Sequence, residues 1–445
     1  GTNVTIIGHS SGTNVSGNNS LIFGHNSGLS VSTNAIIVGN SSGATSISGA
    51  DNIILGQSAG ARMNTARNIA IGTNTSSNLV LPSDTTVIGH YSGTNITGTN
   101  SIILGNASGV NCAATNSIIV GYNSGNSITG SKVLILGSNS GNSVTANAII
   151  IGHDSAAGIT GTGNIIIGQT AASALTSGAN NFIAGSNACN TLSGQISSSV
   201  FIGTNAGLST NASNSIAIGQ NVLATTGGAS SVAIGYGAGA TCTGSSNNVL
   251  LGSLAGNDCT NMVNSVVLGT NAATSTLGTA TAVIIGASAG GGILSSSIAI
   301  GYGALVPGSV TGTTNIAIGY QALSNRLANE SNIAIGYQAM YGSTGKKSTV
   351  IGNSLGGRCG DQNVIIGDNV VNGFVVTTPN TSVMIGSDIT YYGTQDMIVL
   401  GNTIGALNSS NIVIGKTVGA ISGNHNICMG FNLPTNAFAN TNVVV

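Results

Sequence analysis

Cysteine and histidine side chains are the residues of this sequence with the greatest capacity for chemistry, and two pairs recur at a regular interval. Cys242 and Cys259 lie 17 residues apart, and His9 and His25 lie 16 apart. Two neighbouring thiols can form a disulfide, and two imidazoles can share a metal ion. For Cys242 and Cys259 a disulfide and a pair of small buried thiols are both open. No third ligand accompanies the histidines, so we expect exposed turn residues and no metal site.

Tyrosines stand together in two places although aromatic residues are scarce. Tyr302, Tyr320 and Tyr337 each follow the sequence Ile-Ala-Ile-Gly, and Tyr391 and Tyr392 are adjacent. Exposed aromatic rings can contact sugars or proteins, and they also pack against one another across neighbouring strands. We therefore consider all five tyrosines as possible receptor contacts, with local packing as the alternative for each group.

Motifs for catalysis are weak. Gly286-Ala-Ser-Ala-Gly290 matches the pattern Gly-x-Ser-x-Gly, but that pattern acts as a nucleophile elbow only at a strand-to-helix turn of an α/β sheet. The nine acidic residues are scattered and form no recurring pair for acid–base chemistry. We expect no enzymatic activity, no catalytic residues and no cofactor.

Composition limits the kind of protein that could position these side chains. Charged residues make up only 4% of the chain, whereas ordinary soluble domains carry about 25%. Apolar residues reach 41%, which is more than a disordered chain contains. The net charge of −1 and the lack of a basic stripe argue against nucleic acid as a partner. No apolar run approaches the ~18 residues of a membrane span, so we expect no membrane insertion.

A short repeat explains this composition. Its unit is Asn or Ser, three apolar residues and a glycine, followed by small and polar residues. We call the glycine the anchor, position 0, and count along the chain from it. The sequence holds 27 anchors, from Gly8 to Gly430, spaced 14 to 19 residues apart. Apolar β-branched triplets bounded by turn residues favour a coil of two short strands and two turns.

The repeat therefore predicts an all-β fold, a parallel β-solenoid (β-roll) of about 27 short coils. We expect one repeat domain, residues 1–445, that is a segment of a longer chain. The anchor should take a positive φ or allow the next coil to approach closely. A second small residue often stands at +4, as in Gly28 and Gly109, where a side chain would collide with the opposite wall.

The apolar triplet suggests an interface between chains. Positions −1 and −2 are apolar in all 27 copies and position −3 in 24. Because side chains alternate along a strand, we predict that −3 and −1 point into the coil and that −2 points outward. Identical chains in cyclic symmetry would cover the resulting apolar stripe. The residues predicted to form this interface are Ile6, Ile22, Ile37, Ile54, Ile150, Ile166, Ile284, Val413 and Cys428.

Some units resemble those of known fibrous proteins. The segments 315–323 and 332–340 both begin Asn-Ile-Ala-Ile-Gly-Tyr-Gln-Ala, and they resemble repeats of phage and large-virus tail-fibre-like proteins. The segment Asn-Ser-Ile-Ala-Ile-Gly at 214–219 resembles the head repeats of trimeric bacterial autotransporter adhesins. The resemblance implies a homotrimeric β-roll, left-handed as in the adhesin heads. The present coils are mostly longer than those of the adhesin heads, and −2 is often Ile or Val instead of Ala.

These observations favour a structural fibre shaft for surface attachment. We expect a trimeric virion or tail-fibre-like protein that displays a receptor-binding region, located outside the cell or on the virion surface. A bacterial cell-surface trimeric adhesin head is the alternative. An ice-binding solenoid is a weaker third, because no regular Thr-x-Thr face persists. The expected partners are further copies of the chain and a host glycan or protein receptor.

Overall fold

The chain forms two compact units, Gly1–Asn221 and Val222–Val445, which are described separately. The computed structural model contains 28 strands and no helix among the residues it describes, so the all-β prediction is confirmed. The described residues are 1–77, 82–145, 147–191, 196–208, 213–224, 229–275, 281–291, 296–306, 313–324, 330–354, 359–370, 380–390, 396–405, 407–434 and 440–445.

The strands of the N-terminal unit are mostly the apolar triplets themselves. They are β1 (Thr5–Ile7), β2 (Leu21–Phe23), β3 (Ile36–Val38), β4 (Ile53–Leu55), β5 (Ile69–Ile71), β6 (Thr86–Ile88), β7 (Ile102–Leu104), β8 (Ile118–Val120), β9 (Val133–Ser138), β10 (Ala148–His153), β11 (Asn164–Ile167), β12 (Phe182–Ala184), β13 (Val200–Ile202) and β14 (Ile216–Ile218).

The C-terminal unit begins in the same way and then has longer strands that run past the anchor glycine. Its strands are β15 (Val232–Ile234), β16 (Val249–Leu251), β17 (Val266–Leu268), β18 (Val283–Ile285), β19 (Ile298–Ile300), β20 (Ile316–Ile318), β21 (Ile333–Ile335), β22 (Thr349–Ile351), β23 (Val364–Asp368), β24 (Val383–Ile389), β25 (Ile398–Ile404), β26 (Ile412–Val418), β27 (Ile427–Leu433) and β28 (Val443–Val444).

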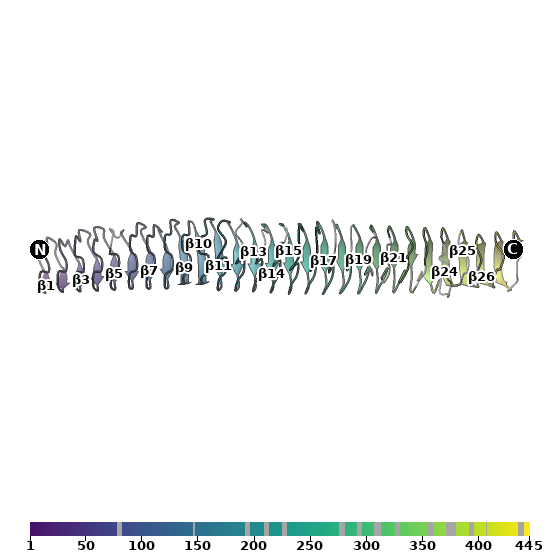
Figure 1. Cartoon of the computed structure of the whole chain (residues 1–445), viewed down its shortest axis with the longest axis horizontal. Helices are drawn as coiled ribbons and strands as arrows, with labels where there is room; N and C mark the ends of the chain where they lie inside the picture. Colours follow the sequence, from purple (N-terminus) through teal and green to yellow (C-terminus); the bar gives the residue numbers. More distant parts are fainter. Residues whose placement is uncertain are drawn as a thin grey trace. The chain divides into compact units, whose positions relative to one another are not determined.

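Within each unit, every strand pairs in parallel with the next strand along the chain (Figure 1). The register follows the repeat, because equivalent positions face each other: Ile103 pairs with Ile119, and Gly386 pairs with Gly401. The architecture is a parallel β-solenoid, as predicted.

The predicted facing of the apolar triplet is wrong. The −2 side chain points into the coil and is fully buried, as Ile103 shows, while Ile102 at −3 is 42% exposed. All but one of the residues predicted to form an outward stripe have no exposed surface: Ile22, Ile37, Ile54, Ile150, Ile166, Ile284, Val413 and Cys428. Only Ile6, in the first strand, is exposed, at 42%.

The reason for this reversal lies in the residues that share a face with −2. Position −4, two residues earlier, is Asn or Ser in 20 of the 27 copies, and its side chain commonly bonds the backbone of the corner before the strand. Asn52 Nδ2 donates to the carbonyl of Gly49 at 2.8 Å and to that of Thr65, in the next coil, at 3.0 Å. The inner face of the narrow coil has room for this amide, one apolar side chain and the anchor glycine. The −3 and −1 side chains are therefore left on the outer face.

The anchor glycine combines both predicted properties. Gly105 has φ of +141°, and a Cβ placed there would lie 1.7 Å from the carbonyl oxygen of Gly121 in the next coil. The +4 glycine also behaves as predicted, because a Cβ on Gly109 would lie 2.7 Å from Cδ1 of Ile103. The anchor glycine thus sets the spacing between coils, and in coils with glycine at +4 the second small residue leaves room for the large −2 side chain.

Candidate functional site

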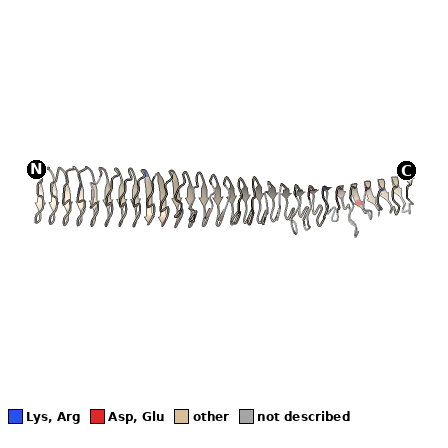
Figure 2. Cartoon of the chain, turned by 45° about the horizontal axis from the view of Figure 1, so that its top comes forward, with Lys and Arg blue, Asp and Glu red and all other residues tan. Residues whose placement is uncertain are grey.

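The outer face of the strands carries a double apolar row in each unit, made of the −3 and −1 side chains. Leu21 and Phe23 are 41% and 49% exposed, and Ile102 and Ile118 are each 42% exposed. Charged side chains are sparse on both units, which leaves few polar interruptions (Figure 2). This double row is the most extended exposed apolar feature of the described residues, and it replaces the −2 stripe as the candidate contact surface.

The +1 position, next to the double row, gathers the aromatic and imidazole side chains. Five of the nine tyrosines and four of the five histidines occupy it. Tyr302, Tyr320 and Tyr337 stack in successive coils, with ring centroids 5.3 and 5.2 Å apart and ring planes 13° and 8° from parallel. The three rings are about half exposed. Their packing against one another in neighbouring coils is confirmed, and the receptor contact stays a prediction. Tyr391 and Tyr392 lie outside the described residues.

His9 and His25 form a second stack at +1. Their ring centroids are 5.3 Å apart and the planes differ by 10°. Within the part of the chain that the structure describes, no three His, Cys, Asp or Glu side chains come together in a way that could hold a metal ion.

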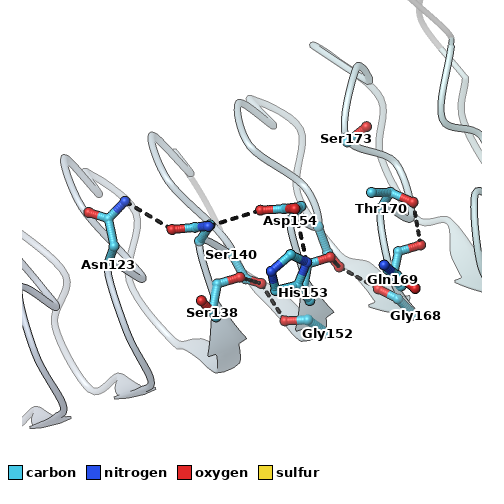
Figure 3. A network of polar contacts seen from close by, with 12 residues as sticks. Asn123, Ser138, Ser140, Gly152, His153, Asp154, Gly168, Gln169, Thr170 and Ser173 are labelled. Atoms are coloured by element: carbon cyan, nitrogen blue, oxygen red, sulfur yellow. Dashed lines mark hydrogen bonds and ion pairs between the residues drawn. The ribbon is translucent and has the colours of Figure 1, made fainter.

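A polar network links a few neighbouring coils of the N-terminal unit, and its side chains at +1 and +2 include Asn123, His153 and Asp154 (Figure 3). Asn123 Nδ2 donates to Asn139 Oδ1 at 3.1 Å, and Asn139 Nδ2 donates to Asp154 Oδ1 at the same distance. The other carboxylate oxygen of Asp154 lies 2.9 Å from His153 Nδ1. The carboxylate, which can only accept when ionised, thus ends a ladder of amide donors. This arrangement fixes the register of neighbouring coils.

Opposite charges follow each other along the −6 and −5 positions in both units. Arg67 lies against Asp84 of the next coil, with Nε 2.5 Å from Oδ1, and this contact lowers the pKa of Asp84 and raises that of Arg67. The C-terminal unit has a shallow depression of about 350 Å³ at the same corner. Its lining mixes both signs and several amides: Glu330, Lys346, Lys347, Asp361, Gln362, Asn380 and Thr381.

The cysteines are all buried thiols, and the structure has no disulfide among them. Cys242 and Cys259 hold equivalent +7 positions in adjacent coils, and the residues that follow them, Thr243 and Thr260, form a parallel bridge. Cys112 and Cys359 share the +7 position, and burial raises the pKa of each thiol to about 11. Cys428 lies inside the coil and not on an outward stripe.

Two structural roles were not predicted from the sequence. Position +2 takes a left-handed conformation in coil after coil, for example at Asn123 (φ +51°) and Asp154 (φ +54°). Its preference for Asn, Ser, Asp and Gly is the signal that could have revealed this. Position +3 is a buried serine in many N-terminal coils, where the hydroxyl of Ser108 donates to the carbonyl of Gly121, the next anchor. The recurrent Ser-Gly pair at +3 and +4 was visible in the sequence.

No helix of the described residues is both long and apolar enough to span a membrane. Comparison of the sequence with protein-family profiles and with curated proteins gives no match.

Proposed function

We propose that this chain is the shaft of a homotrimeric fibre that attaches one surface to another, as in a virion or tail fibre. The observation that carries the proposal is the double apolar row on the outer face of the sheet. A bacterial trimeric adhesin head is the second candidate, and it draws on the same row and on the resemblance of segment 214–219 to adhesin repeats.

The size of the double row supports an interface. The N-terminal unit alone contributes about two dozen apolar side chains, many of them near 40% exposed. If a whole Ile or Val side chain represents roughly 100 Å², the exposed part of this row amounts to roughly 1,000 Å². A monomer usually shows patches of a few hundred Å², and a stable interface needs about 800 Å² from each partner.

The periodicity of the row favours a second copy of the same chain as its cover. Apolar side chains recur once per coil, at the spacing of about 4.8 Å between paired strands. A partner that matches every coil must carry the same repeat over the same length, and an identical chain does so. The number of three chains comes from the resemblance to trimeric fibres and adhesin heads.

The mass of the native protein in solution is the direct test. We expect the wild-type chain to have three times the mass of one chain. The paired substitutions Ile102→Asp and Ile118→Asp place charges in the double row, where burial against a partner would be strongly disfavoured, so they should shift the mass toward a monomer. Thr97→Asp, on an exposed position at +8, is the matched control and should leave the mass unchanged. A monomeric wild-type chain would refute the proposal.

Attachment requires a contact with a receptor, and we assign this role to the aromatic ladder Tyr302–Tyr320–Tyr337. Exposed aromatic side chains are enriched at binding surfaces, and this ladder lies beside Gln321 and Gln338, which are joined by a hydrogen bond of 2.9 Å. Tyr391 and Tyr392 remain a predicted second contact. A binding assay on host cells or a glycan array distinguishes the two groups of tyrosines. It compares the wild-type chain with a Tyr320→Ala variant and with a Tyr391→Ala, Tyr392→Ala variant.

Loss of binding in one variant alone would assign the receptor contact to that group of tyrosines. Equal binding by all three proteins would exclude both groups as contacts. In that case the described coils would serve as a spacer, and the mass measurement above would still decide whether they form a trimer.

A further inference from the structure

Two of the six thiols differ from the other four because they lie at equivalent positions of adjacent coils. Cys242 is 1% exposed and Cys259 is 0% exposed, and both occupy the +7 core position, which holds larger apolar residues such as Val31, Met63 and Ile96 in several other coils. Cys242 Sγ donates to the carbonyl of Gly256 at 2.8 Å, and Cys259 Sγ donates to that of Ala273 at 3.1 Å. Each thiol therefore leans toward the following coil in the same manner.

The two thiols also interact with each other. A hydrogen bond with Cys259, followed by burial, raises the pKa of Cys242 well above its usual range. None of the other four cysteines has a cysteine at the same position of an adjacent coil. For Cys112 the equivalent residues in the neighbouring coils are Ile96 and Ile128.

We propose that Cys242 and Cys259 are an oxidative modification site, at which a small-molecule disulfide converts the two thiols into a disulfide that joins adjacent coils. The thiolate of one cysteine attacks a sulfur of the reagent and forms a mixed disulfide, and half of the reagent leaves as a thiol. The second cysteine then attacks the protein sulfur of that mixed disulfide and releases the other half. The protein loses two electrons and two protons, and the reagent gains them as two thiols.

The geometry of the stack fits this product. A disulfide requires Cα atoms about 4.4–6.8 Å apart, and equivalent positions of paired strands lie about 4.8 Å apart. The Cβ atoms must approach to about 4 Å, which is closer than an in-register ladder holds them. Thr243 and Thr260 form an isolated bridge and not a continuous ladder, so this corner has fewer backbone bonds to oppose the approach.

Burial and the raised pKa of Cys242 predict that the reaction is slow in the intact coil and proceeds when the corner opens locally. A thiolate is the attacking species, and little of it forms in the closed state. The product carries no charge, so it suits the apolar site better than a thiolate does. This inference does not depend on the fibre function.

The test is a thiol count on the full chain. The native protein is incubated in glutathione buffers of increasing oxidised-to-reduced ratio, at 25 °C and at a higher temperature that opens coils locally. It is then unfolded, alkylated and weighed. We expect the number of alkylated thiols to fall from the six of the reduced chain to four, with a non-reduced peptide that links Cys242 to Cys259.

Substitutions identify the pair. Cys242→Ser should keep all five remaining thiols, whereas the matched control Cys112→Ser, at the same +7 position, should lose two and keep three. Cys259→Ala provides a second variant if serine at 242 prevents folding, which the circular dichroism of the sheet would report. Six alkylated thiols at every ratio and temperature, glutathione adducts without a link, or a link between other cysteines would each overturn the proposal.

Discussion

Coils from the two units fill the same core in opposite ways. In the coil of Gly105, Ile103 at −2 extends from the strand toward Gly109 at +4, and the Cβ that glycine lacks would lie 2.7 Å from the isoleucine. In the coil of Gly319, Ala317 at −2 is small and Leu323 at +4 is large, and both are buried. The core between the two walls is filled in both coils, but the large side chain comes from −2 in one coil and from +4 in the other.

Several other coils show the same exchange. Phe201, the largest −2 residue, faces Gly207, on which a Cβ would lie 2.4 Å from the ring. The small residues Ala299 and Ala334 stand with Leu305 and Met340 at +4. The difference teaches that in these coils the space between the two walls must be filled, by a side chain from either wall, because interiors are packed nearly without voids.

The exchange has a cost in backbone conformation. Position +4 is left-handed in both kinds of coil, with φ of +62° at Gly109 and +50° at Leu323. Glycine adopts this region freely, whereas another residue loses roughly 1–2 kcal/mol there. Coils of the Ala–Leu type therefore carry strain that coils of the Ile–Gly type do not.

The anchor glycine is common to both regions, and its substitution should have the largest effect. A Cβ at Gly105 would lie 1.7 Å from a backbone oxygen, and one at Gly319 would lie 2.2 Å from another. Gly105→Ala and Gly319→Ala should each lower the free energy of local unfolding by more than about 4 kcal/mol, since neither oxygen can move without its coil. Amide hydrogen exchange of the neighbouring coils measures this.

The control for the anchor is Gly158→Ala, where a Cβ would have no atom within 4 Å. This substitution should leave amide exchange almost unchanged. Equal exchange in the Gly105, Gly319 and Gly158 variants would mean that the anchor does not set the spacing between coils.

Removal of core volume should have the next largest effect. Ile103→Ala leaves Gly109 facing an empty space, and it should lower the free energy of local unfolding by about 2–5 kcal/mol. Ile102→Ala on the outer row is the matched control. In a chain without partner chains, it should cost well under half as much free energy as Ile103→Ala. Similar costs for both residues would contradict the inward facing of −2.

Substitutions that move the large side chain from +4 to −2 should have an intermediate effect on stability. Ala317→Ile overfills a coil that Leu323 already fills, at a cost of about 1–3 kcal/mol. Leu323→Gly empties it, and the double variant recreates the Ile–Gly arrangement. We expect the double variant to be more stable than the sum of the single effects predicts, by 1 kcal/mol or more on the scale of contacting residues. Additive effects in hydrogen exchange would contradict the idea of a conserved volume.

The sequence predicted the repeat, the parallel stacking and the steric need for glycine at 0 and +4, because these follow from the spacing of apolar and small residues. It did not predict which face of the triplet is buried. All three positions of the triplet are apolar, so neither face of the strand is polar and the pattern does not mark the solvent side. The polar residue at −4 was the missing clue, since Asn52 and its equivalents are buried and hydrogen-bonded.

The candidate contact surface was predicted only in part for the same reason. The tyrosine ladder follows directly from three copies of one motif stacked in register. The apolar row was predicted on the wrong face, at −2 instead of at −3 and −1. Ala299, Ala317 and Ala334 are fully buried, and their small size matches the large residues at +4.

The smallest effect expected concerns the partner of the anchor carbonyl, which differs between the two kinds of coil. In the N-terminal unit the carbonyl of Gly121 accepts from the hydroxyl of Ser108, whereas the carbonyl of Gly319 accepts from the amide of Ala322 in its own coil at 3.4 Å. Ser108→Ala removes a buried donor and should cost about 1 kcal/mol, because the carbonyl of Gly121 then loses its side-chain partner. Ala322→Ser should change stability by less than half of that, since the turn already supplies a donor. Hydrogen exchange of the coil that contains Gly121 decides the question: a Ser108→Ala chain that exchanges like the wild type would show that the serine ladder is incidental to the stack.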